Sequence, residues 1–232
     1  MTLLAVAAPD GDPEHRLPET VREVTEVARR WTRARLVTDG AAGLAELHGD
    51  ETVWHLACHC DTVPERILDS ALLLSHGQVT LREILAMPSV PRRLAVLSAC
   101  NTHVSGTELP DEAMGLPAGF LHAGFAGVVA SHWPVNDYST ALLMTRFHDL
   151  WHGQGLPPPV ALAEAQRWLR WATHADVGAY LDGVLYQPAA RSPERLAQWE
   201  AVRPYEHRPY GDRPHRPYGH PFFWAPFALT GH

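Results

Sequence analysis

The fold of this chain is indicated most clearly by one stretch, Arg93-Leu94-Ala95-Val96-Leu97-Ser98-Ala99-Cys100-Asn101-Thr102. After Arg93 the residues are apolar up to Leu97 without polar alternation, as expected of a strand that is buried on both faces. A thiol, an amide and a hydroxyl follow directly, at residues 100–102. Ligands and catalytic groups gather at the carboxyl ends of strands in open parallel sheets. The stretch therefore predicts a buried strand that ends in a reactive site.

Strand-like and helix-like segments alternate on both sides of this stretch. Valines at 21, 24 and 27 recur at helical spacing with Trp31. Strands are predicted over Leu3–Ala7, Ala34–Val37, Thr52–Ala57, Ala71–Ser75 and Ala126–Ser131. Helices are predicted over Leu17–Trp31, Ala41–Leu47, Thr80–Met87, Ala113–Ala123, Asp137–His152 and Pro159–Ala172. This alternation predicts an α/β sandwich with a mostly parallel sheet.

Composition excludes several classes of protein. The 232 residues suit one large domain or two small ones, and a net charge of −7 argues against nucleic acid as a direct partner. Every basic residue is arginine, which excludes lysine Schiff bases and phosphate-binding lysines. No run approaches 18 apolar residues, so we expect no membrane span. Three cysteines are too few for a disulfide scaffold. We expect a cytoplasmic protein with reduced thiols.

The segment 203–221, RPYEHRPYGDRPHRPYGHP, has no helical or strand period. Its irregular Arg-Pro-Tyr repeats predict a mobile surface loop, with a docking segment for an acidic partner as the alternative. The apolar residues that follow, up to position 232, predict a last strand that returns to the sheet.

A second strand end carries reactive groups, because the strand up to Ala57 is followed by Cys58-His59-Cys60-Asp61. A histidine and a cysteine at neighbouring strand ends could meet across the top of the sheet. The imidazole would then raise the thiolate fraction of the thiol and return a proton to a departing amine. Two alternatives stay open here: cysteines after strands are often core residues, and the group His55, Cys58, His59 and Cys60 resembles zinc ligands.

Several motifs, in this order along the chain, resemble the CHAT family of caspase-like cysteine peptidases, which is related to caspases and separases. They are Pro9–Asp12, Leu17–Glu19, His55–His59, Ser70–Ser75, Leu97–Thr102, Asp111–Leu116, Phe120–Gly124, Val128–Asp137 and His220–Phe227. Because the likeness covers nearly the whole chain, it implies a single caspase-like domain over residues 1–232. The implied fold is a three-layer α/β/α sandwich with a mostly parallel central sheet.

The resemblance also implies a reaction and its residues. Cys100 matches the family's nucleophile and His59 its general acid/base, so the implied activity is hydrolysis of peptide bonds in a protein substrate. The oxyanion would be held by the backbone N–H groups of Cys60 and Cys100. Asp137 matches the acid that contacts a basic P1 side chain in separases, which implies cleavage after arginine or lysine. The alternative role for Asp137 is to cap the helix that begins there.

This sequence departs from the family at Cys60, where glycine is usual. A non-glycine residue would be strained there if the position needs a positive φ. A second thiol so close to the nucleophile also suggests a reversible Cys60–Cys100 disulfide that inactivates the enzyme. A plain tolerated residue is the simpler alternative. An inactive interaction module that binds a partner without hydrolysis is the main rival function.

The resemblance implies no cofactor and no required metal. CHAT domains commonly follow helical repeats that are thought to regulate them. We therefore expect a separate regulatory protein, or such a repeat region beyond this chain. The family context suggests bacterial signalling, antiviral defence or regulated cell death.

Overall fold

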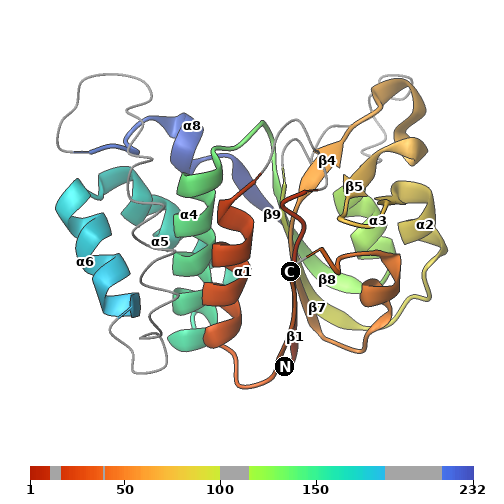
Figure 1. The fold of residues 1–232 in the computed structure, drawn as a ribbon, viewed down its shortest axis with the longest axis horizontal. Helices are drawn as coiled ribbons and strands as arrows, with labels where there is room; N and C mark the ends of the chain where they lie inside the picture. Colours follow the sequence, from red (N-terminus) through yellow and green to blue (C-terminus); the bar gives the residue numbers. More distant parts are fainter. Residues whose placement is uncertain (11–16, 39, 100–114, 186–215) are drawn as a thin grey trace.

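The computed structural model describes residues 1–10, 17–38, 40–99, 115–185 and 216–232. Its centre is a six-stranded sheet (Figure 1), and the strand order is β2-β1-β3-β7-β8-β9. The strands are β1 (Leu3–Ala7), β2 (Ala34–Val37), β3 (Val53–Ala57), β7 (Arg92–Ser98), β8 (Phe125–Ser131) and β9 (Phe227–Gly231). All neighbours are parallel except β9, which pairs antiparallel with β8.

Strand β7 is buried on both faces, as its sequence predicts. Leu94 and Val96 belong to the apolar core on one side of the sheet, and Ala95 and Leu97 belong to the core on the other side. Successive side chains on a strand point to opposite faces, so an all-apolar strand can serve two cores at once. This is why the run at 94–97 lacks polar alternation.

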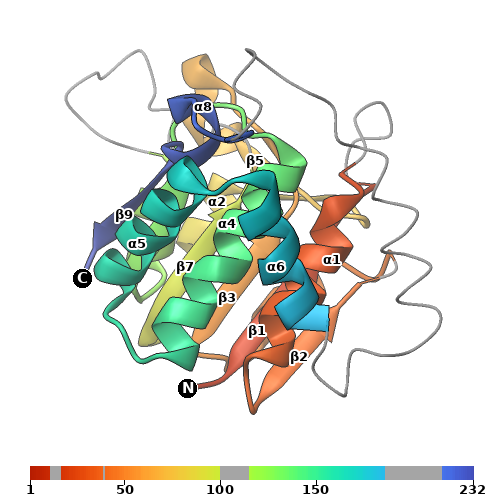
Figure 2. The same ribbon diagram turned by 90° about the vertical axis from the view of Figure 1, so that its left-hand side faces the viewer.

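Helices cover one face of the sheet, and Figure 2 views the molecule from that side. This layer contains α1 (Glu19–Arg29), α4 (Asp137–His148), a π-helical turn (Asp149–Gly153), α5 (Pro158–Trp171) and α6 (His174–Leu185). The short helix α8 (Pro221–Trp224) packs against α4 and α5. The layer's apolar side chains form a core with β1, β3, β7 and β8.

The opposite face carries α2 (Leu81–Ala86), α3 (Leu116–His122) and a small antiparallel sheet (Figure 1). That sheet has the order β4-β5-β6 and consists of β4 (His59–Asp61), β5 (Ala71–Leu73) and β6 (Gln78–Thr80). Two 3₁₀ helices, Leu44–His48 and Pro64–Asp69, complete the described elements of this side. The prediction of a three-layer α/β/α sandwich with a mostly parallel sheet is confirmed.

Several local predictions need correction. The segment predicted as a helix over 41–47 is a 3₁₀ helix that begins only at Leu44. The C-terminal segment begins with α8 before it forms the predicted strand, β9. Strands β4 and β6 and helix α6 were not predicted at all. Of the predicted loop at 203–221, residues 203–215 lie outside the described residues.

Helix α6 did have a signal in the sequence. Thr173 accepts a hydrogen bond from the backbone N–H of Asp176, and the Asp176 carboxylate accepts one from the backbone N–H of Thr173. This reciprocal pair is a capping box of the Ser/Thr-x-x-acid type. The glycines at 178 and 183 weaken the helical pattern behind it. Among the described helices, none combines the length and apolarity that crossing a membrane requires.

Candidate active site

The site predicted from the motifs lies at the carboxyl ends of β3 and β7. These strands are parallel neighbours with Ala57 in register with Ser98. The backbone N–H of Cys58 continues the pairing by donating to the carbonyl of Ser98 at 3.3 Å. His59 comes one residue later, and Ala99 is the last described residue before position 100. Cys100 lies outside the described residues.

His59 opens the short strand β4, where it is in register with Leu73 of β5. The residue is half-buried, and its Nε2 atom is buried without a hydrogen-bond partner among the residues described. A buried ring nitrogen is costly to leave without a partner. His59 therefore offers a nitrogen that a further group could engage at this strand end.

Cys60 lies inside β4 and is in register with Leu72 of the antiparallel neighbour β5. A strand residue has an extended backbone that any amino acid adopts, so the structure requires no glycine at this position. The Cys60 Sγ lies 3.8 Å from the Thr62 hydroxyl oxygen. The sequence-based concern about strain at Cys60 is thus removed, whereas the Cys60–Cys100 disulfide stays a prediction because Cys100 is not described.

Asp137 is the first residue of α4, but it does not cap that helix. The Asn136 side chain accepts the capping hydrogen bond from the backbone N–H of Ser139 at 3.0 Å. Asp137 Oδ2 instead accepts from the backbone N–H of Glu19 at 2.9 Å, at the start of α1. Pro18 precedes α1 and has no capping side chain, so Asp137 supplies the acceptor from another helix. The alternative prediction that Asp137 caps its own helix is wrong in this respect.

The environment of Asp137 disfavours its charge. Burial of its carboxyl group raises its pKa to about 7, although the hydrogen bond from the Glu19 N–H lowers the pKa in part. The neighbouring acids Glu23 and Glu19 raise the pKa further, while the Arg22 guanidinium lowers it. A positive group placed beside such a carboxyl would lower its pKa and favour the ionised form at neutral pH.

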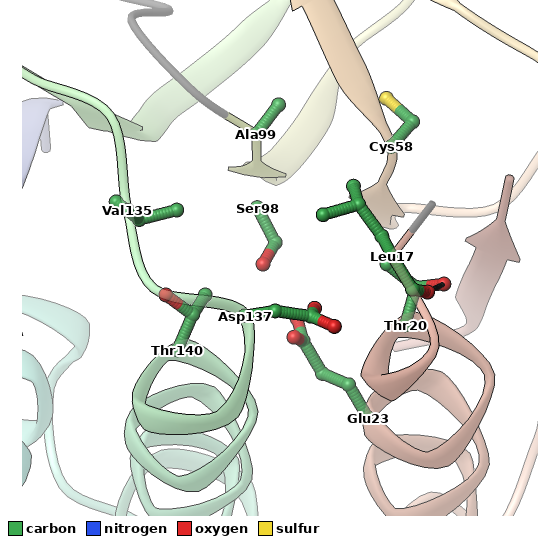
Figure 3. A pocket seen from close by; sticks show the side chains of 9 residues that line it. All are labelled: Leu17, Thr20, Glu23, Cys58, Ser98, Ala99, Val135, Asp137 and Thr140. Atoms are coloured by element: carbon green, nitrogen blue, oxygen red, sulfur yellow. Dashed lines mark hydrogen bonds between the residues drawn. The ribbon is translucent and has the colours of Figure 1, made fainter. Parts of the chain in front are cut away.

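Asp137 lines a small cavity directly below the two strand ends (Figure 3). The cavity volume is about 10 Å³, close to the least space that can hold one water molecule. Its walls come from α1, the ends of β3 and β7, and the start of α4; the lining residues are Leu17, Thr20, Glu23, Cys58, Ser98, Ala99, Val135, Asp137 and Thr140. The cavity therefore adjoins both chain segments that lead into the predicted dyad.

Glu23 belongs to a buried series of side-chain hydrogen bonds that was not predicted from the sequence. Its Oε1 lies 2.7 Å from His55 Nε2, and His55 Nδ1 lies 3.1 Å from His148 Nε2. Trp31 Nε1 donates to His148 Nδ1 at 3.2 Å. Glu23, His55 and His148 are each no more than 1% exposed.

The indole of Trp31 determines which atoms donate and which accept in this series of hydrogen bonds. Indole N–H only donates, so His148 Nδ1 must accept. A neutral His148 then donates from Nε2 to His55 Nδ1, and His55 in turn donates from Nε2 to Glu23. Burial, followed by the neighbouring His55, lowers the pKa of His148 well below its usual value, which keeps the ring neutral. All four ring nitrogens of the two histidines are thereby satisfied, and the Glu23 carboxyl is fixed in place.

The structure also bears on the alternative prediction that His55, Cys58, His59 and Cys60 bind zinc, because His55 and Cys58 lie on opposite sides of the sheet. His55 faces the α1 and α4 layer and is engaged by Glu23 and His148. Cys58 is fully buried in the apolar core on the opposite side of the sheet, as a core cysteine would be. Within the described ranges, no group of three or more potential ligands is arranged to hold a metal.

Comparison with known proteins identifies the family of this chain. The family model described as "CHAT domain" matches residues 1–232. The chain belongs to the CHAT family. The resemblance in the sequence motifs is thereby confirmed over the whole CHAT domain. No curated protein matches it.

Among solved structures, the CHAT domain is similar to the crystal structure of the Arg specific cysteine proteinase gingipain R (RGPB). The TM-score is 0.49 at 11% sequence identity, and the match covers 99% of the CHAT chain. The CHAT chain spans 45% of the length of that protein.

Proposed function

We propose that this CHAT domain is a cysteine endopeptidase in which Cys100 is the nucleophile and His59 the general acid/base. The observation that carries this proposal is the register of β3 and β7. With Ala57 beside Ser98 and the Cys58 N–H bonded to the Ser98 carbonyl, the segments leading to positions 59 and 100 start side by side. The His59 Nε2 atom, buried and without a partner in the described part of the chain, is suited to a thiol partner.

The reaction follows from these two groups. The Cys100 thiolate attacks the scissile carbonyl carbon, and the carbonyl oxygen becomes an oxyanion held by the N–H groups of Cys60 and Cys100. The carbon–nitrogen bond then breaks, and His59 gives its proton to the leaving amine. A thioester remains on Cys100. Water, deprotonated by His59, attacks this thioester and releases the acid product and the thiol.

Asp137 is the group proposed to select a basic P1 residue. Its carboxyl lines the cavity below the strand ends and has a raised pKa, so a positive side chain would favour its ionised form. A charge-assisted hydrogen bond to that form is stronger than one between neutral groups. The proposed substrate is a protein cleaved after a positively charged residue.

The setting is proposed from the family alone. We place the enzyme in the cytoplasm of a bacterium, in signalling, defence or regulated cell death. Its control is assigned to a separate regulatory protein or to a helical repeat region of a longer chain.

Fluorogenic peptides that differ only at P1 test this function. Peptides ending in arginine or lysine should be cleaved, and those ending in aspartate or norleucine should not. Cys100→Ala and His59→Ala should abolish cleavage, while His122→Ala, at an exposed histidine on α3, should leave it unchanged. A lysyl or arginyl chloromethyl ketone should alkylate Cys100 and require His59, as read by mass spectrometry. Binding of a partner without either cleavage or labelling would favour the inactive interaction module.

A further inference from the structure

Arginine and tryptophan side chains gather on the outer helical layer, at the end of α5 and around α8 (Figure 2). Trp171, the last residue of α5, is 50% exposed. The Cζ atom of Arg216 lies 4.4 Å from the centre of its ring, and that of Arg170 lies 5.1 Å away. Arg170 also lies 5.0 Å from the ring of Trp224 on α8. A guanidinium is attracted to the face of an indole ring, so these contacts order side chains at the surface.

A pocket of about 480 Å³ adjoins this cluster, between the end of α4, the π-helical turn and α5. Its lining combines apolar side chains with charged ones, and the residues are Arg146, Leu150, Leu156, Glu164, Arg167, Trp168 and Trp171. Trp171 thus belongs both to the pocket and to the cluster of arginines. The volume is large enough for a ligand to bury an apolar group there.

Arg146 is the positive group of this pocket that lacks an acidic partner. Its guanidinium lies over the rings of Trp168 and Tyr180. Among the described residues, its buried Nε atom has no hydrogen-bond partner. Asp149, three residues further along the chain, is engaged by Arg30 and by the Tyr180 hydroxyl instead. Leaving a buried donor without an acceptor costs free energy, so Arg146 is suited to a carboxylate from outside.

The two arginines beside Trp171 also lack carboxylate partners. Arg170 and Arg216 are exposed and contact aromatic rings, and neither forms an ion pair within the described ranges. Arg167 is different, because Glu164 pairs with it. This surface is therefore positively charged, whereas the chain as a whole carries a net charge of −7.

The composition of this surface is typical of the centre of a protein–protein interface. Tryptophan and arginine are the residues most enriched among those that dominate binding energy. A positive area on an acidic protein attracts an acidic partner here and repels it elsewhere, which orients the encounter. Nucleic acids and anionic membranes carry a dense, continuous negative charge that the rest of this acidic chain would repel.

We propose that this surface binds an acidic segment of a partner protein. We call it the arginine–tryptophan surface, and it consists of Arg146, Arg170, Arg216, Trp168, Trp171 and Trp224. Carboxylates of the partner pair with the three guanidiniums, and an apolar side chain of the partner enters the adjoining pocket. Arg216 belongs to the Arg-Pro-Tyr segment, for which an acidic partner is the alternative prediction from the sequence.

The geometry of the arginines supports this mode of binding. Each guanidinium uses its flat face for the aromatic ring, so the N–H groups along its edge stay available for a carboxylate in the same plane. The ring contacts already hold the side chains in place, which reduces the entropy lost on binding. None of the six residues lines the cavity beneath the strand ends, so this inference is independent of the proposed peptidase function.

Selection from a display library of short random peptides tests the surface without a known partner. The bait is the full chain with Cys100→Ala, so that no peptide is cleaved. Peptides that also bind the Arg170→Glu, Arg216→Glu double variant are removed. We expect the remaining peptides to combine acidic residues with leucine or an aromatic residue. Enrichment of basic or uncharged peptides, or of none, overturns the inference.

Affinities of a synthetic copy of the best peptide, measured by fluorescence anisotropy, assign the residues. Arg170→Gln and Arg216→Gln should each weaken binding about tenfold, and Trp171→Ala tenfold or more. The matched control is Arg82→Gln, at an exposed arginine on α2 across the sheet, and it should change binding less than twofold. Thermal unfolding shows that each variant is folded. Equal losses in the control, or no loss in the other variants, overturn the assignment.

Exchange of charges tests direct contact. A peptide with arginine in place of a glutamate should bind the Arg170→Glu or the Arg216→Glu protein but not the protein with both arginines. Damage to the fold would not produce such a rescue. If no exchanged glutamate restores binding to either variant, the proposed pairing is wrong.

Three other occupants are measured with the same Cys100→Ala protein. The probes are single-stranded DNA, vesicles of phosphatidylcholine with phosphatidylserine, and the protein itself in sedimentation velocity. We expect none of these to depend on Arg170 or Arg216. Binding of DNA or vesicles more tightly than the peptide, or a dimer that Arg216→Gln abolishes, would assign the surface to that occupant and overturn the inference.

Discussion

The carboxylate of Asp137 accepts a hydrogen bond from the backbone N–H of Glu19, at a distance of 2.9 Å across 118 residues of sequence. This contact joins the first residue of α4 to the first residue of α1 and provides the cap that Pro18 cannot give. It also holds the acid at the wall of the cavity beneath the strand ends. One side chain thus has a structural role and a proposed role in substrate recognition, and the two can be separated.

Asp137→Asn should separate them. The amide oxygen still accepts from the Glu19 N–H, so at pH 5, where the folded Asp137 carboxyl is protonated, we expect a melting temperature close to that of the wild type. The negative charge is lost, so kcat/KM on basic P1 peptides should fall by roughly 100-fold. Asp137→Ala should lose the same activity and also the cap, which contributes about 1 kcal/mol to stability. Thermal unfolding and the peptide assay measure the two effects. Full activity of the asparagine variant would remove Asp137 from substrate recognition.

The raised pKa of Asp137 predicts a dependence of stability on pH. Unfolded, this carboxyl titrates near its ordinary value of about 4; in the folded protein its pKa is about 7. Between these values the folded state holds a proton that the unfolded state has released. The stabilisation that comes from protonated Asp137 is therefore complete below about pH 4 and is lost as the pH rises through 7.

Asp137→Asn has no such titration and serves as the reference. From pH 5 to pH 8, the unfolding free energy of the wild type should fall by about 2–3 kcal/mol relative to that of the asparagine variant. Urea unfolding at the two pH values measures this difference. A difference that is the same at both pH values would show that the carboxyl is not shifted.

The buried series of hydrogen bonds from Trp31 to Glu23 predicts that replacing His148 lowers the free energy of unfolding considerably. In His148→Phe, the Trp31 N–H and His55 Nδ1 lose their partners while remaining buried. We expect a loss of stability of about 2–4 kcal/mol. His152→Phe is the control, because His152 stacks on Trp31 with ring centroids 3.8 Å apart and phenylalanine keeps that contact. Chemical denaturation measures both, and similar effects of the two variants would contradict the hydrogen-bonded chain.

A disulfide between Cys60 and Cys100, as predicted from the sequence, would make the proposed enzyme sensitive to oxidation. A thiol-specific oxidant such as diamide should inactivate the wild-type protein, and dithiothreitol should restore activity. Cys60→Ser, which keeps the strand geometry of β4, should resist this inactivation. Mass spectrometry of the oxidised protein should find a peptide pair that joins the two cysteines. Equal sensitivity of the serine variant, or a pairing that involves Cys58, would reject the switch.

The main strands could be predicted from the sequence because each is buried on both faces and therefore consists almost entirely of apolar residues. The segment 94–97 must be apolar on both faces to serve two cores, and β1 and β8 follow the same rule. Strands β4 and β6, of three residues each, carry no such pattern, since they are strands only through their pairing with β5. Short antiparallel pairings depend on distant partners and leave little trace in a local sequence window.

The sequence by itself determined the CHAT family, the three-layer sandwich and the residues proposed for the dyad, because these depend on motifs and apolar runs that are local in the chain. Only the tertiary structure decided the surroundings of Asp137. Glu23 lies on the apolar stripe of α1 and His148 near the end of α4, and neither position indicates its partners. Their hydrogen bonds span 32 and 93 residues to His55. Packing two helices against one strand creates these contacts, and with them the polar cavity beside the proposed active site.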